Sequence, residues 1–261
     1  MLFSKKKKKI INAIDSKIKS LLIYFYYTQK PRLINPLNYI SKVNEFLAYK
    51  YIKKRENLFK LVLESTKKSN STGVSFSDYR VLYEIIKKYK PKHILELGSG
   101  ISSLIMAYAL KENFFETKVK GLLETYEEDP FYFKQVKSLT KNDLKKFVNF
   151  NFSERETKRI LNMKASMYRS VKIKEYELIF IDGPTLWSKN EKKVGEKSFN
   201  ADILNILSKI KKPPKFILLD KKIGTMWALK KCLPDTNLDF NFIKGLVRIN
   251  YKNGQRILND V

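Results

Sequence analysis

The chain has 261 residues, of which 43% are hydrophobic, so it can bury the core of one large α/β domain with an appended segment and is not disordered throughout. It carries 53 Lys and Arg against 26 Asp and Glu, an excess that is typical of proteins that bind nucleic acid. Only eight of the 53 are Arg, the residue on which proteins that read bases depend most, so a nucleic-acid partner is possible but not favoured. Cys232 and His93 are the only cysteine and histidine, which excludes an intramolecular disulfide and a Cys/His zinc cluster and favours a reducing, cytoplasmic compartment.

The first segment, residues 1–72, is predicted to be a basic helical extension. A lysine run, Lys5–Lys9, leads into apolar residues spaced along one helical face, but the stretch is too short and too often interrupted by charge to span a bilayer. We expect this helix to dock on its own domain or on a partner. Peripheral contact of residues 1–30 with the anionic inner face of a membrane stays an alternative.

The rest of the extension is expected to be helical up to a linker. Residues 31–64 have a helical pattern with breaks near Pro31 and Pro36, and Lys67–Gly73 is rich in Ser and Asn. The sequence therefore divides into an extension, 1–72, and a larger domain, 73–261.

In the larger domain, short apolar strands alternate with helices. The expected helices are Phe76–Lys88, Ile101–Lys111, Pro130–Leu139, Lys192–Lys209 and Ile223–Cys232. The expected strands are His93–Leu97, Lys118–Tyr126, Phe147–Phe152, Tyr176–Asp182, Lys215–Asp220, Asp239–Ile243 and Leu246–Tyr251. This alternation predicts an α/β fold with a doubly wound, mostly parallel seven-stranded sheet, to which a C-terminal hairpin at Lys244-Gly245 adds one antiparallel strand.

The clearest signal of a binding site is a glycine turn between the first of these strands and its helix, in the sequence LELGSG. The acidic residue Glu96 precedes the turn Gly98-Ser99-Gly100, and the helix begins at once. Ligands of such sheets bind outside the carboxyl ends of the strands, and we expect glycine here because a β-carbon would keep a ligand from the backbone.

An acidic residue follows the second strand. In Tyr126-Glu127-Glu128-Asp129-Pro130, Glu127 stands at the strand end and Pro130 suits the first turn of a helix. A carboxylate has only acceptors, so Glu127 could receive hydrogen bonds from both hydroxyls of a ribose. We prefer Glu127 to Glu124 for this role, and an acidic first helical turn is the structural alternative.

Two later strands also end in acids. Leu178–Ile181 runs into Asp182 and a Gly-Pro turn, and Phe216–Leu219 runs into Asp220. Because the carboxyl ends of parallel strands share one edge, these acids are expected on the same edge as Gly98 and Glu127.

At these residues the chain resembles the class I S-adenosylmethionine-dependent methyltransferases, which are Rossmann-like. The likeness runs from about Val74 to the C-terminus and is strongest in LELGSG, YEEDP and FIDGP. It implies S-adenosyl-L-methionine as cofactor, with Glu96, Gly98, Ser99 and Gly100 along its methionine and ribose side. It further implies Glu127 on the ribose hydroxyls and Asp182 beside the methyl group. Ser102 stands where the family usually has a third glycine.

The residue that contacts adenine is not settled by the sequence. The candidates are Ser153, Glu154, Ala165 and Ser166.

Two other nucleotide-binding classes fit less well. A nicotinamide dehydrogenase would need glycine where Ser103 stands, and Glu127 lies 29 residues after Gly98, beyond the usual spacing of about 20. There is no Walker-type loop.

The acceptor is the open question. The turn after Ile181 lacks the second proline and the aromatic residue of base-amine methyltransferases, so O-methylation of a small-molecule or glycan hydroxyl is preferred, with Asp182 as the catalytic base.

Asp182 and Asp220 could bind Mg²⁺, but Lys221 occupies the place of the expected Asn, so no metal is assigned. The alternatives are an RNA methyltransferase and a non-catalytic adaptor that binds a membrane or partner.

Overall fold

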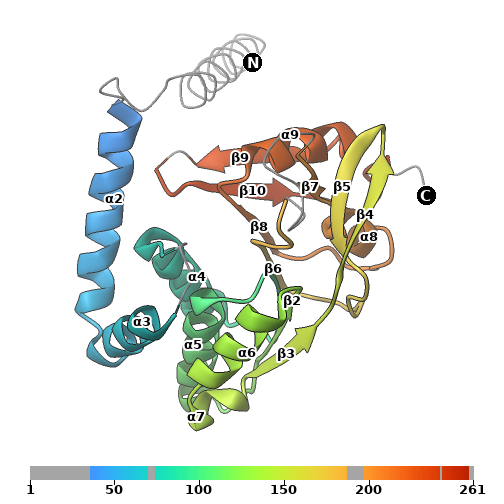
Figure 1. Ribbon diagram of the computed structural model, residues 1–261. Helices are drawn as coiled ribbons and strands as arrows, with labels where there is room; N and C mark the ends of the chain where they lie inside the picture. Colours follow the sequence, from blue (N-terminus) through green and yellow to red (C-terminus); the bar gives the residue numbers. More distant parts are fainter. Residues whose placement is uncertain (1–35, 70–73, 187–196, 242, 259–261) are drawn as a thin grey trace, which may run out of the picture.

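The computed structural model describes residues 36–69, 74–186, 197–241 and 243–258, and a seven-stranded sheet lies at its centre (Figure 1). The strand order is β3-β2-β1-β6-β8-β10-β9. Its strands are β1 His93–Leu97, β2 Leu122–Glu127, β3 Val148–Phe152, β6 Leu178–Ile181, β8 Phe216–Asp220, β9 Asn237–Asn241 and β10 Leu246–Asn250. The first five of that order are parallel, and β10 pairs antiparallel with both β8 and β9. The predicted Rossmann-like sheet with its C-terminal hairpin is confirmed.

Alternate residues of the central strands face two separate apolar cores, one on each side of the sheet. In β6, Leu178 and Phe180 join one core, and Ile179 and Ile181 join the other. The first core is covered by α4 (Phe76–Tyr89), α5 (Ile101–Thr117), α6 (Pro130–Leu139) and α7 (Asn142–Lys145). The second is covered by α8 (Asp202–Leu207) and α9 (Ile223–Cys232). This two-sided burial explains why the central strands are continuous apolar runs.

A second, three-stranded sheet was not predicted. It consists of β4 (Arg155–Ile160), β5 (Met163–Tyr168) and the short β7 (Phe199–Asn200), in the order β4-β5-β7. The predicted helix Lys192–Lys209 is therefore wrong over β7, where Phe199 pairs with Ala165 of β5, and only α8 is helical in its described part.

Several element boundaries also differ from prediction. The helix expected to end at Lys111 continues to Thr117, and the following strand begins at Leu122 instead of Lys118. Lys118 ends this helix with a positive φ of 60°. The short helix α7 was not predicted.

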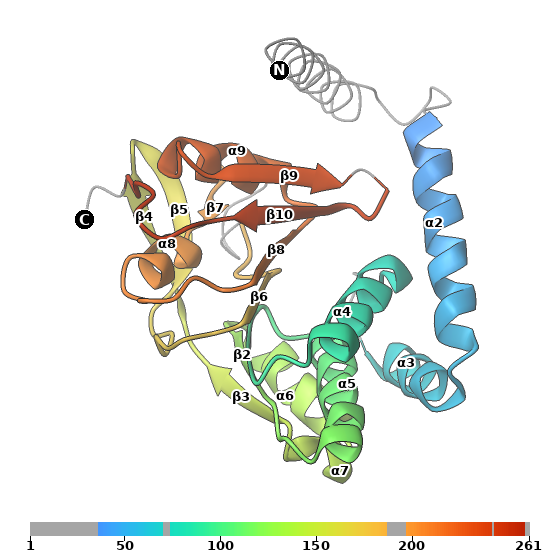
Figure 2. The same cartoon turned by 180° about the vertical axis from the view of Figure 1, so that it is seen from behind.

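The N-terminal helices pack on the same side as α4 and α5 (Figure 2). They are α2 (Pro36–Lys53) and α3 (Glu56–Lys68). The start of α2 at Pro36 agrees with the break expected near this proline, and a further interruption at Lys54-Arg55 was not predicted. Leu58, Leu61 and Val62 of α3 are buried in the core that α4 and α5 share. The predicted helix at residues 10–25 and its membrane contact lie outside the described residues. None of the described helices combines the length and the hydropathy needed to cross a bilayer.

Candidate functional site

The carboxyl ends of β1, β2 and β6 lie side by side. Leu97 of β1 is paired with Tyr126 of β2 on one side and with Ile181 of β6 on the other. The residues that follow these three are Gly98, Glu127 and Asp182. The Asp182 amide donates a 2.7 Å hydrogen bond to the Leu97 carbonyl, and this bond aligns the end of β6 with the end of β1. The structure therefore brings the glycine turn and two predicted acids together at one edge.

The two predicted glycines of the turn have different surroundings. Gly98 has a φ of +99°, and a β-carbon on it would lie 2.5 Å from the Gly183 nitrogen. The protein's own backbone thus requires glycine at this position, which corrects the expectation that ligand approach alone does. Gly100 is in an extended conformation, with only the Ser102 hydroxyl within reach of an added β-carbon, at 3.7 Å. A β-carbon on Gly100 would therefore meet little of the described part of the chain, in contrast to one on Gly98.

Glu96 does not line the open edge. Its side chain is fully buried and accepts hydrogen bonds from three hydroxyl groups, those of Ser102 (2.6 Å), Thr125 (2.7 Å) and Ser103. Burial raises the pKa of Glu96 to about 7, and the hydroxyl bonds oppose this shift. Glu96 thus joins the first turn of α5 to β1 and β2 and supports the glycine turn, and its contact with the cofactor stays a prediction.

Glu127 is the predicted ribose-binding acid. Its two carboxylate oxygens accept hydrogen bonds from the Ser99 amide (3.2 Å) and the Asp129 amide (2.9 Å), and each oxygen keeps a further lone pair. Only 6% of the residue is exposed, and burial, followed by the negative charge of Glu128, raises its pKa to about 8. Hydroxyl donors from a ligand would complete its hydrogen bonding and favour its charged form.

Glu124, the other acid considered for this role, is already bound by protein groups. Its carboxylate accepts 2.7 Å hydrogen bonds from the Lys174 ammonium and from the Tyr176 hydroxyl, and the residue is buried. It lies within β2, paired with Leu95, and not at the strand end. This geometry supports the preference for Glu127.

Asp182 is the accessible acid of the site. Its side chain is 44% exposed, and the Lys222 ammonium lies 3.6 Å from its Oδ1 and also donates to its main-chain carbonyl. Lys222 follows β8 by two residues and was not singled out from the sequence, although its place after a strand-ending acid is the signal that could have found it. The pair places a carboxylate and a cation together at the edge.

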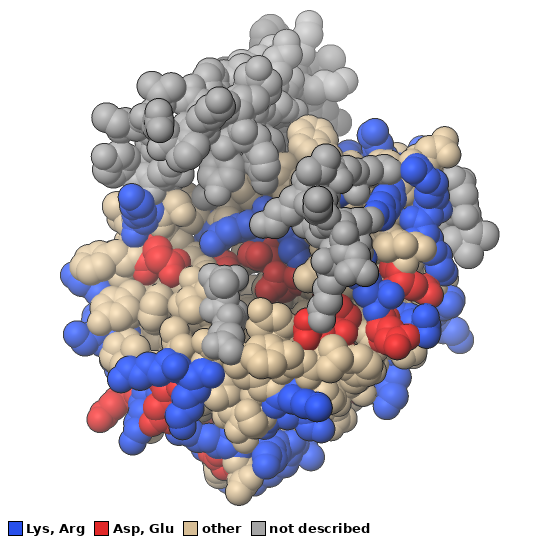
Figure 3. Space-filling view, in the orientation of Figure 1, with Lys and Arg blue, Asp and Glu red and all other residues tan. Residues whose placement is uncertain are grey.

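Two more acids lie close to this pair. Burial, together with the negative charges of Asp182 and Asp78, raises the pKa of Asp220 to about 7. Asp78 lies in the first turn of α4, where burial raises its pKa to about 6, and the Lys221 ammonium is 3.9 Å from its Oδ2. Figure 3 shows acidic side chains in a hollow near the middle of one face, with basic side chains beside them. Asp78 had no signal in the sequence beyond its place in a helical first turn.

The adenine-contact candidates fall into two groups. Ser153 is buried, and its amide donates a 3.0 Å hydrogen bond to the Glu127 carbonyl; Glu154 follows it on the surface. Ala165 and Ser166 are buried in β5 of the second sheet, where they pair with β7. Ser153 and Glu154 are therefore the two that adjoin Glu127, the predicted ribose-binding acid.

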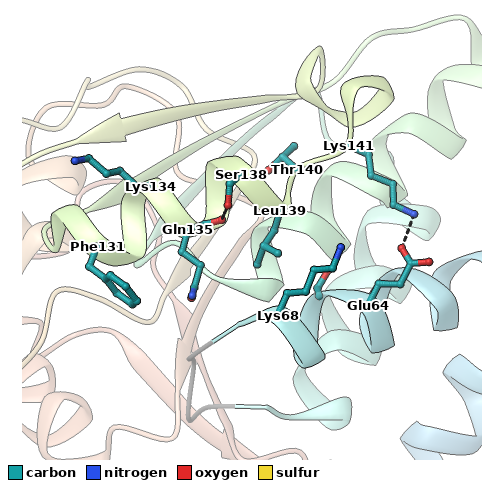
Figure 4. Close-up of a pocket in the computed structure, with 10 residues that line it drawn as sticks. Glu64, Lys68, Phe131, Lys134, Gln135, Ser138, Leu139, Thr140 and Lys141 are labelled. Atoms are coloured by element: carbon teal, nitrogen blue, oxygen red, sulfur yellow. Dashed lines mark hydrogen bonds and ion pairs between the residues drawn. The ribbon is translucent and has the colours of Figure 1, made fainter.

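A cavity of about 650 Å³ lies elsewhere, between α3 and α6 (Figure 4). It is lined by residues such as Glu64, Lys68, Phe131 and Lys141, and the Lys141 ammonium lies 2.8 Å from a Glu64 oxygen. No residue of the predicted site lines it. Over the described part of the chain, no group of three His, Cys, Asp or Glu side chains is arranged to hold a metal ion.

No protein-family model and no curated protein sequence matches the chain. Among solved structures, it is similar to the O-methyltransferase TomG from Streptomyces achromogenes, in complex with SAM, with 13% identity, a TM-score of 0.52, and coverage of 84% of this chain and 100% of that one. Magnesium protoporphyrin IX methyltransferase from Synechocystis matches with 13% identity and a TM-score of 0.36, over 69% of this chain and 87% of that one. The TomG likeness shows that this chain has the class I methyltransferase fold.

Proposed function

We propose that this chain is an S-adenosylmethionine-dependent methyltransferase that methylates a hydroxyl of a small molecule or glycan. The observation that carries the proposal is the alignment of Gly98, Glu127 and Asp182 at the ends of three adjacent strands. Ligands of doubly wound sheets bind at this edge. The O-methyltransferase TomG, which shares the fold, was crystallised with this cofactor, and this supports the choice of ligand.

The residues at the edge suit an adenosyl ligand. Glu127 would accept hydrogen bonds from the ribose hydroxyls, because its carboxylate offers acceptors only and already lies against the Ser99 amide. Gly100 and Ser99 would lie along the ligand, with open space beside Gly100. Ser153 or Glu154 would be nearest to the adenine of the ligand, because Ser153 is hydrogen-bonded to the Glu127 backbone. The bound cofactor would supply an electrophilic methyl group.

Asp182 would act as the catalytic base. It is exposed at the edge, so an acceptor hydroxyl can reach it, and it would take the hydroxyl proton as the oxygen gains the methyl group. Lys222, 3.6 Å away, would orient the carboxylate. Glu127 and Asp182 thus have separate tasks, one on the cofactor and the other on the acceptor.

A transfer assay with tritium-labelled cofactor and a panel of sugars, glycans and RNA tests this proposal. We expect label in hydroxyl-bearing small molecules or glycans, and a loss of about 10²- to 10⁴-fold in kcat for Asp182→Asn. Asp143→Asn, on the exposed α7 helix, is the matched control. Label in RNA alone would favour the RNA methyltransferase alternative, and an unchanged rate for Asp182→Asn would exclude it as the base. A chain that neither binds nor turns over the cofactor would favour the adaptor.

A further inference from the structure

A second cavity, of about 460 Å³, is lined in part by Lys222, whose ammonium lies 3.6 Å from the proposed catalytic base, Asp182. Its charged lining residues are Lys164, Lys197, Lys221, Lys222 and Lys231, and its aromatic ones are Phe199 and Trp227. No Asp or Glu lines it within the described residues. The cavity is therefore a concave, positively charged surface with one exposed aromatic ring, that of Trp227, and one buried ring, that of Phe199.

The position of the cavity links it to the methyl-transfer edge. Lys221 and Lys222 directly follow β8, and the Lys222 ammonium is the group that lies 3.6 Å from Asp182 Oδ1. The opposite wall comes from the second sheet, through Lys164 of β5 and Phe199 of β7. A molecule in this cavity would be held between the two sheets, next to the carboxylate that would accept its proton.

The charges of Lys221, Lys222 and Lys231 are only partly compensated by the described residues. Lys222 is close to Asp182, and Lys221 reaches Asp78 only at 3.9 Å. For Lys231, which is exposed on α9, the described residues provide no ion pair or hydrogen bond. Charges of one sign in a concave site concentrate the field and attract ligands of the opposite sign.

Trp227 supplies a different kind of contact. It lies on α9 and is 50% exposed, so its ring is available to a ligand in the cavity. A flat aromatic face packs well against the apolar face of a ring, while the surrounding lysines meet its charged substituents.

We propose that this cavity binds the acceptor, and that the acceptor is an anionic sugar, a sugar ring that carries a phosphate or a carboxylate. The assignment rests on the proposed function, because it takes Asp182 as the base. The ring would lie against Trp227, the anionic group would contact Lys231 and its neighbours, and a ring hydroxyl would face Asp182. The cavity volume suits a sugar of one or two rings and not a folded RNA.

Fluorescence of Trp227 tests the proposal directly. Trp187 is the only other tryptophan of the chain, so a Trp187→Phe background leaves Trp227 as the single reporter. Its emission would be titrated with glucose 6-phosphate, glucuronate, methyl glucoside and a short RNA, each at low and at high salt. We expect the two anionic sugars to bind at least about tenfold more tightly than methyl glucoside and to weaken as salt is added.

Lys231→Ala should weaken binding of glucose 6-phosphate by about fivefold or more, whereas Lys145→Ala, an exposed lysine on α7, should have no effect. Circular dichroism would establish that both variants are folded. Equal binding of methyl glucoside, tighter binding of RNA, or no effect of Lys231→Ala would overturn the proposal. These titrations need no cofactor, so they test the anionic-sugar site separately from the proposed methyl transfer. Anionic-sugar binding without S-adenosylhomocysteine binding would keep the anionic-sugar site but overturn the proposed function, and with it the role of the sugar as acceptor.

Discussion

Gly98 and Gly183 lie in van der Waals contact across the ends of β1 and β6, so that a β-carbon on Gly98 would be 2.5 Å from the Gly183 nitrogen. A β-carbon on Gly183 would in turn be 2.7 Å from the Gly98 α-carbon. The glycine turn and the Gly-Pro turn are therefore fitted to each other, and this fit sets the positions of the residues on either side.

Gly98→Ala should destabilise the protein by at least about 2 kcal/mol, because its φ of +99° is unfavourable for alanine and the added β-carbon meets backbone. Gly100→Ala is the matched control. Gly100 is extended and has open space around it, so its alanine variant should keep the stability of the parent but bind S-adenosylhomocysteine more weakly. Urea denaturation and calorimetry measure the two effects. Equal stability of the two variants would contradict the backbone fit.

Cofactor affinity should rise with pH up to about pH 8. The folded protein without ligand holds a proton on Glu127, whose pKa is about 8, and ribose hydroxyls would favour the charged form. Below that pKa, binding must release the proton, so affinity should increase by up to about tenfold per pH unit. Calorimetry in buffers of different ionisation enthalpy measures the released proton. In Glu127→Gln, affinity should be weaker and independent of pH. If Glu127→Gln still releases a proton when it binds S-adenosylhomocysteine, the assignment of Glu127 to the ribose is contradicted.

Asp202→Asn should stabilise the protein at high pH. Asp202 is buried, its Oδ1 accepts the Tyr168 amide at 2.9 Å, and no hydrogen-bond partner for its Oδ2 lies within the described residues. Burial raises its pKa to about 8, so the folded state binds more protons than the unfolded state between about pH 4 and 8. Stability therefore falls as pH rises through this range.

An asparagine keeps the acceptor for Tyr168 and removes the ionisation. We expect Asp202→Asn to reduce the loss of stability between pH 5 and pH 8 by about 1 to 3 kcal/mol. Buried Glu127, with a pKa of about 8, and Glu96, with a pKa of about 7, would retain a slope of the same sign. Urea denaturation at the two pH values measures the free energy of unfolding. If its change between pH 5 and pH 8 is the same in Asp202→Asn as in the parent, the role given to Asp202 is contradicted.

The N-terminal helices should unfold together with the rest. Leu58 of α3 is fully buried in the core shared with α4 and α5, so Leu58→Ala should cost about 2 to 5 kcal/mol in one cooperative transition. Leu47→Ala on α2 is the control, since Leu47 is 50% exposed and its removal should change stability by less than about 0.5 kcal/mol. Two separate transitions would show that the extension, 1–72, is an independent unit.

The sequence predicted the main sheet well because its strands are short apolar runs that end in glycine or acid, as at Leu97 and Ile181. Parallel strands share the edge at which they end, so the placement of Gly98, Glu127 and Asp182 on one edge could be predicted from the alternation of strands and helices. That β6 lies directly beside β1 is a result of the strand order in the structure. Burial could not be predicted in the same way. The full enclosure of Glu96 depends on hydroxyls that lie on β2 and α5.

The second sheet was missed for two physical reasons. Strand β4, RETKRI, is mostly polar and exposed, and such residues are uncommon in strands. The turn between β4 and β5 has positive φ at Leu161 (49°) and Asn162 (61°), a conformation usually marked by Asn-Gly or Asp-Gly and not by leucine. Strand β7 forms only by pairing with β5, 34 residues earlier at Phe199 and Ala165, which no local pattern shows.

The most direct test of the adenosyl site is isothermal titration of the full chain with S-adenosylhomocysteine, beside Glu127→Ala and Glu116→Ala. Glu116 is an exposed acid on α5 that pairs with lysines, so it controls for the loss of charge. We predict micromolar binding to the parent and to Glu116→Ala, and at least about a tenfold loss for Glu127→Ala. No heat with the parent, or equal affinity for all three proteins, would contradict the site at the ends of β1, β2 and β6.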